Sequence, residues 1–195
     1  MSLPHALLTS LLERPSSGLE LANRFDKSIG FFWNASHQQI YRELARLEQS
    51  KWVVSSPVED GRGRKRIYRV LPAGKRALQR WIEEVSDPRP LRDEMMVRLR
   101  AEAVVGPTKL GRELERRVAL HHQKLATYRA IEARDFTGKT ASRSEQLQHL
   151  VLRTGILHET MYIEVTLAAL AILEGEPHRA RRGRPGHSLR AASRR

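Results

Sequence analysis

Apolar residues at steps of three and four predict three short helices at the start of the chain. A Pro-Ser-Ser-Gly break ends the first of them. Ser17 with Glu20, and Ser36 with Gln39, have the spacing of a capping box, in which two side chains satisfy backbone N–H groups at a helix start. These pairs therefore predict the starts of the second and third helices.

The third predicted helix is followed by a change of pattern. It has Ile40, Leu44 and Leu47 on one face, and two β-rich runs then cover residues 52–56 and 67–70. A turn rich in Gly and Arg separates the two runs, which predicts a two-stranded hairpin. Three helices followed by such a hairpin is the order of elements in a winged-helix domain.

Pro72 starts a further helix, and Pro88-Arg89-Pro90 is expected to end the N-terminal domain. Beyond it, three helices are predicted over residues 91–105, 108–134 and 144–173. The apolar seam of the second is narrow, as in a coiled coil or a helix pair, so we expect a second copy of the chain to cover it. The residues predicted to join two copies are Leu110, Leu114, Val118, Leu125, Tyr128, Leu157, Met161 and Val165.

The expected fold is therefore mainly α, with three parts. Residues 1–88 form an α+β winged helix-turn-helix domain with a two-stranded wing. Residues 89–175 form an all-helical dimerisation and effector domain. Residues 176–195 contain seven Arg and one Glu with few apolar side chains, and we expect this basic tail to be disordered in isolation.

Composition narrows the class of protein. The net charge of +13 comes mainly from the two ends of the chain, and clustered basic charge favours a polyanion such as double-stranded DNA; a generally basic surface is the alternative. The chain has no Cys, which excludes disulfides and thiolate zinc sites. The N-terminus has no signal-peptide pattern, and residues 167–173, the longest apolar run, are too short to span a bilayer. These features predict a cytoplasmic protein without a membrane partner.

Two groups of side chains are candidates for DNA contact. The third helix presents polar residues at its N-terminal end, where a helix-turn-helix protein places its base contacts; an ordinary solvated helix face is the alternative. The hairpin tip carries basic residues around two glycines, which suits phosphate or minor-groove contact; a charged hairpin that resists aggregation is the alternative. The candidates are His37, Gln38, Gln39, Arg42 and Arg46 on the helix, and Arg62, Arg64, Lys65 and Arg66 on the wing. Tyr41 can contact phosphate or complete the core.

The run from Ser36 to Glu48, Ser-His-Gln-Gln-Ile-Tyr-Arg-Glu-Leu-Ala-Arg-Leu-Glu, resembles the third helix of the PadR family of bacterial regulators. The wing from Gly61-Arg62 through Tyr68 to Gly74 is also similar. The resemblance implies a homodimer that binds an inverted repeat through its winged helices, with Ser36, Gln39 and Tyr41 near DNA. It further implies repression, relieved in some members by a small aromatic or amphipathic effector.

The remaining motifs are less specific. Met95, Met96, His158 and Tyr162 are candidate effector contacts, although core packing is the alternative for most of them. In the tail, Arg182-Gly183-Arg184-Pro185 is similar to an AT-hook core, and a nonspecific electrostatic tail is its alternative.

Enzymatic chemistry is not expected. His158-Glu159-Thr160-Met161-Tyr162 lacks the second His of a zincin, so no metal site is predicted. His121 and His158 lie on apolar stripes, and we expect each to be a hydrogen-bonded core residue or a residue of a ligand pocket. The sequence predicts no catalytic residues and no cofactor. Two other functions stay open: a nonspecific nucleoid-type architectural protein, and an interaction module that dimerises without responding to a ligand.

Overall fold

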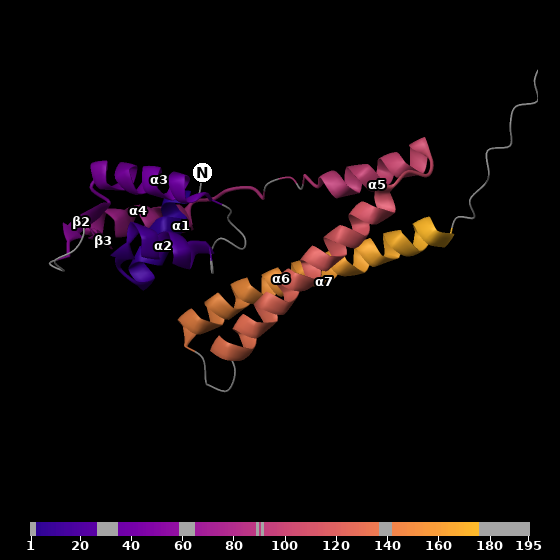
Figure 1. Cartoon of the computed structure of the whole chain (residues 1–195). Helices are drawn as coiled ribbons and strands as arrows, with labels where there is room; N and C mark the ends of the chain where they lie inside the picture. Colours follow the sequence, from indigo (N-terminus) through magenta and orange to yellow (C-terminus); the bar gives the residue numbers. More distant parts are fainter. Residues whose placement is uncertain are drawn as a thin grey trace, which may run out of the picture. The chain divides into compact units, whose positions relative to one another are not determined.

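The structure, a computed structural model, describes residues 3–26, 35–58, 65–88, 90, 92–136 and 142–175. The chain divides into two compact units, Met1–Leu91 and Arg92–Arg195, called unit 1 and unit 2 below (Figure 1). Helices dominate both units, and unit 1 adds a small antiparallel sheet. This architecture confirms the predicted fold class.

Unit 1 is built around a core of side chains from its first three helices. The fully buried residues include Leu8 of α1, Phe25 of α2 and Leu44 of α3. The elements of unit 1 are α1 (Leu3–Glu13), β1 (Ser16–Ser17), α2 (Gly18–Asp26), α3 (His37–Gln49), β2 (Val53–Pro57), β3 (Arg66–Val70) and α4 (Pro72–Glu83). Because Ile40, Leu44 and Leu47 of α3 all face this core, as predicted, the opposite side of α3 is left to solvent.

The sheet contains one strand more than the sequence pattern predicts. Its order is β1-β3-β2, with Ser16 opposite Tyr68 and Val53 opposite Val70, and both pairings are antiparallel. β1 is only two serines long and lies where the sequence indicates a break between helices. Serine has no strong strand preference, so this strand arises from the backbone of β3 beside it and not from a local pattern.

Both predicted capping boxes are present. The Ser17 backbone N–H donates to Glu20 Oε2 at 3.0 Å, and the Glu20 N–H donates to Ser17 Oγ at 3.3 Å. At α3 the Ser36 N–H donates to Gln39 Oε1 at 2.8 Å, while Ser36 Oγ accepts from the Gln39 N–H. Each cap fixes where its helix begins and how the preceding chain enters it.

α4 begins at Pro72, as predicted, but only part of its predicted apolar face is buried. Leu78 is buried, whereas Trp81 and Ile82 are exposed and Val85 lies beyond the helix end. Gly74 is buried at the start of α4, where an added Cβ would lie 2.3 Å from the Trp52 carbonyl oxygen. Close packing of this turn against the chain entering β2 therefore requires glycine at position 74.

Unit 2 contains α5 (Glu94–Val105), α6 (Leu110–Asp135) and α7 (Arg143–Gly175) in its described part. α6 and α7 pack along one another (Figure 1), and Met95 of α5 is buried with Leu110, Leu114 and Ala169. By length and composition alone, α7 is apolar enough to cross a membrane. The sequence-based expectation considered only uninterrupted apolar runs. It did not identify α7 as a candidate span, because the apolar residues of α7 are separated by scattered polar ones.

Candidate nucleic-acid interface

The solvent-facing side of α3 carries the predicted DNA-contacting residues. His37, Gln38 and Arg42 are exposed, and the helix presents them opposite its buried apolar face. Arg46 is also exposed and lies 3.4 Å from Glu43 in the same helix. The first turn of α3 therefore offers hydrogen-bonding side chains beside a positive helix end, a combination that suits the base edges and phosphates of duplex DNA.

Three residues that the family resemblance places near DNA also have local structural contacts. Ser36 and Gln39 form the α3 cap, so the Gln39 amide oxygen is already engaged. Tyr41 is 45% exposed, and its ring lies against Gly18, where an added Cβ would be 2.5 Å from the ring. Tyr41 is therefore a surface residue seated on the start of α2, not a member of the core.

The wing residues divide into two groups. Arg62 and Arg64 lie outside the described residues. Lys65 Nζ lies 2.9 Å from Glu20 Oε1, and Arg66 donates to Ser55, so both basic residues have partners within unit 1. The Ser17 N–H, the Lys65 ammonium and the Ser17 hydroxyl together lower the pKa of Glu20 to about 2. The carboxylate thus stays charged over the physiological range and holds the base of the wing.

The predicted dimer residues fall into two sets in unit 2. Leu110, Leu114, Leu125 and Tyr128 are buried in the single chain, and Val118 is partly buried. Leu157, Met161 and Val165 of α7 are exposed. The seam on α6 therefore joins α6 to its own α7, and only the α7 set is available to another chain.

The four candidate effector residues are not gathered in one pocket. Met95 is buried in the helical core, Met96 is partly exposed, and the His158 ring lies 4.7 Å from the Tyr162 ring. The Tyr162 hydroxyl donates to Asp93, the residue that caps α5. This hydrogen bond raises the pKa of Tyr162 to about 12 and lowers that of Asp93.

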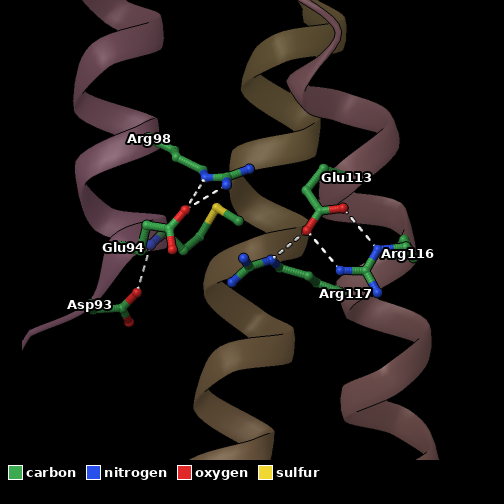
Figure 2. A network of polar contacts seen from close by, with 7 residues as sticks. Asp93, Glu94, Arg98, Glu113, Arg116 and Arg117 are labelled. Atoms are coloured by element: carbon green, nitrogen blue, oxygen red, sulfur yellow. Dashed lines mark hydrogen bonds and ion pairs between the residues drawn. The ribbon is translucent and has the colours of Figure 1, made fainter.

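Sequence patterns missed a polar network in unit 2. Figure 2 shows Asp93 and the Glu94–Arg98 pair on α5, and Glu113 between Arg116 and Arg117 on α6. The two guanidinium groups lower the pKa of Glu113 to about 2. These pairs lie three or four residues apart, a spacing that could have identified them in the sequence.

A buried carboxylate lies further along the same helices. Glu159 is 4% exposed and is hydrogen-bonded to His121 Nδ1, which confirms His121 as a hydrogen-bonded residue. Beside this pair, α6 has an open hollow of about 430 Å³, and the described residues include no group able to hold a metal ion. The hollow is lined by Arg116, Arg117, Leu120, His121, Gln123, Lys124 and Thr127.

Both units match known protein families. Residues 7–80 match the Transcriptional regulator PadR-like family, and residues 91–174 match Virulence activator alpha C-term. Over 176 residues the chain is 42% identical to the Probable transcriptional regulator Rv1176c of Mycobacterium tuberculosis (strain ATCC 25618 / H37Rv). That match covers 84% of this chain and 93% of the relative.

Solved structures share the fold. The Vibrio cholerae virulence activator AphA is 30% identical with a TM-score of 0.73, over 89% of this chain and 98% of that one. Bacillus subtilis PadR in complex with operator DNA is 23% identical with a TM-score of 0.76, over 88% and 98%. PadR, a negative transcriptional regulator, has also been solved with p-coumaric acid.

The fold and the polar edge of α3 define a winged-helix DNA-binding protein. The chain belongs to the PadR-like family of transcriptional regulators, as its sequence indicates. Members of this family are transcriptional regulators and not enzymes.

Proposed function

We propose that this regulator represses transcription as a homodimer that binds an inverted repeat. The observation that carries the proposal is the exposed polar edge of α3, with His37, Gln38 and Arg42 at the capped start of the helix. Two copies related by a two-fold axis would present these edges to successive major grooves, about 34 Å apart. Residues 1–88 would bind DNA and residues 89–175 would hold the dimer together.

Support for the homodimer comes from α7. Its exposed apolar residues recur at steps of three, four and seven along the side that does not pack on α6. This α7 stripe consists of Leu147, Leu150, Leu157, Met161, Val165 and Ile172, each at least 40% exposed. A continuous apolar stripe of this length is unfavourable in water, and a second copy can cover it with the same surface.

A bilayer is a poorer partner for α7 than a second copy. α6 packs along α7 and carries exposed charged side chains over its length, among them Arg112, Lys124 and Arg129. These charges would have to enter the hydrocarbon together with α7, at a cost of about 2.5–3.5 kcal/mol for each one near the bilayer centre.

We propose that unit 2 binds a small aromatic or amphipathic effector, and the hollow on α6 favours an acidic one. The hollow on α6 is lined by Lys124, by Arg117, which is also paired with Glu113, and by the apolar side chain of Leu120. Such a ligand could change DNA affinity only by binding one dimer geometry more tightly than another. The solved complex of PadR with p-coumaric acid gives a precedent for this ligand class.

The basic tail, residues 176–195, lies outside the described residues, and we propose that it adds DNA contacts. Its seven Arg can neutralise phosphates. In Arg182-Gly183-Arg184-Pro185, Gly and Pro add little bulk, so the segment can enter a narrow A·T minor groove, where the Arg side chains meet the negative potential.

A reporter assay tests the sign of regulation. Duplexes that the wild-type protein selects from a random-sequence pool would be placed in the promoter of a reporter gene. We expect expression of the protein to lower reporter output, and a promoter with the scrambled site to show no change. Raised output would instead support activation, the second candidate, which is favoured by the match of residues 91–174 to a virulence-activator family.

Two substitutions test the placement of the interface. Gln38→Ala should change which bases are preferred in a second round of selection, because an amide can bond adenine in bidentate fashion. Arg64→Ala should weaken binding to all sequences alike and lower the salt dependence by about one phosphate contact. Filter binding on selected and scrambled duplexes at several salt concentrations measures both effects. Wild-type behaviour of both variants would place the interface elsewhere.

A footprint of the wild-type protein tests the alternative function. Uniform protection of any DNA would favour an architectural protein.

A further inference from the structure

A chain of hydrogen bonds connects the last turn of α3 to the wing. Glu48 Oε1 accepts from the Ser55 backbone N–H at 3.0 Å and from the Ser55 hydroxyl at 2.6 Å. The backbone N–H of Ser55, in β2, is therefore bonded to a side chain of α3. This contact fixes the direction of β2 relative to α3, the helix that carries the exposed polar edge.

The chain continues into β3. Arg66 Nε donates to Ser55 Oγ at 2.7 Å, and Arg66 Nη2 donates to the Ser55 carbonyl oxygen at 2.9 Å. Arg66 is the first residue of β3 and lies opposite Pro57, the last residue of β2. We call these three residues, Glu48, Ser55 and Arg66, the wing clamp.

The burial of Ser55 and the opposite charges of Glu48 and Arg66 favour this arrangement of the wing clamp. Ser55 is 6% exposed, so its hydroxyl and its N–H depend on protein partners. The negative charge of Glu48 at one end of the clamp is matched by the positive charge of Arg66 at the other. Both groups act on Tyr68, which lies opposite Ser55: burial and the Glu48 charge raise its pKa, and Arg66 opposes them.

We propose that Glu48 and Ser55 are positioning residues for DNA binding, which set the direction of the wing relative to α3 through Arg66. The guanidinium of Arg66 then serves the wing clamp and is not a primary phosphate ligand, in contrast to the expectation from sequence. A DNA-binding surface made of two separate elements needs such a link, because both must meet the duplex in one rigid arrangement. The inference rests on the proposed use of α3 and the wing.

The test compares Glu48→Ala with Glu48→Gln in the full-length chain. The probe is the duplex that the wild-type protein selects from a random pool. Glu48→Ala removes both hydrogen bonds that Glu48 accepts from Ser55, and we expect it to lower DNA affinity about tenfold and to reduce the salt slope by about one. In a hydroxyl-radical footprint, wing protection should fade while protection by α3 remains. Glu48→Gln keeps an acceptor for Ser55 and should stay within about threefold of wild type.

The matched control is Gln49→Ala, an exposed neighbour on the same helix, which should bind as wild type does. Thermal unfolding of each variant shows how much protein is folded at the binding temperature. An unchanged salt slope and unchanged wing protection in folded Glu48→Ala would overturn the inference. Equal loss of α3 and wing protection would overturn it too, since that result means general destabilisation. If the wild-type protein selects no preferred duplex, the proposed function fails instead.

Discussion

Replacing Phe25 with alanine is expected to lower the free energy of unfolding of unit 1 by about 3–5 kcal/mol, the range found for large-to-small changes at buried aromatic positions. Phe25 is fully buried where α2 meets α3, among Leu21, Ile40 and Leu44. The free energy of unfolding of a domain is commonly only about 5–15 kcal/mol. The substitution should therefore remove a large share of the stability of unit 1. Unfolding of this core would displace α3, and DNA binding would be weakened as a result.

Urea denaturation followed by tryptophan fluorescence measures this effect directly. The three tryptophans of the chain, Trp33, Trp52 and Trp81, all belong to unit 1, so their emission is not sensitive to unfolding of unit 2 alone. The matched control is Leu19→Ala, on the same helix but 57% exposed, which should cost less than about 1 kcal/mol. Equal midpoints for the two variants would show that the core does not support α3 in the way described.

Replacing Leu157 with aspartate is expected to convert the proposed dimer into a monomer. Leu157 is 64% exposed near the middle of the α7 stripe, and a two-fold axis would bring a carboxylate from each copy into the apolar contact. Burying those charges without partners is strongly unfavourable. Since binding of two linked half-sites commonly gains a factor of about 10²–10⁴ over one, affinity for an inverted repeat should fall at least about 100-fold.

Light scattering after size-exclusion chromatography gives the oligomeric state, and titration of a full repeat and of a half-site gives the affinities. Ala126→Asp is the control, because it places the same group at an exposed position of α6, outside the α7 stripe. Half-site affinity should be unchanged in both variants. A Leu157→Asp protein that is still dimeric would move the interface to another surface.

Local chemistry explains which parts of the fold could be predicted. The caps at Ser17 and Ser36 involve side chains three residues apart, and the buried side of α3 follows from the spacing of its own apolar residues. Lys51, in contrast, has φ 56°, a left-handed conformation that favours glycine, and it turns the chain from α3 into β2. A lysine at that position gives no sign of the turn in the sequence.

The parts of the candidate site that could not be predicted depend on distant residues. Lys65 pairs with Glu20 and Arg66 with Ser55, so basic residues near a hairpin tip cannot be assigned to DNA from their charge alone. The helical seams pose the same problem. Leu114 and Leu157 follow similar spacings, yet one is buried against its own chain and the other is exposed, and periodicity does not distinguish an intramolecular partner from an intermolecular one.

The small sheet of unit 1 also has a consequence for solubility. A strand at the margin of a sheet can recruit a strand from another molecule and start aggregation, especially when it is long and its backbone groups are free. Here β1 offers only two residues at one margin. At the other margin, Pro57 has no N–H to donate, and the N–H and C=O of Ser55 are occupied by Glu48 and Arg66. Neither margin is a good template, so this basic protein can be concentrated on DNA with little tendency to polymerise through its sheet.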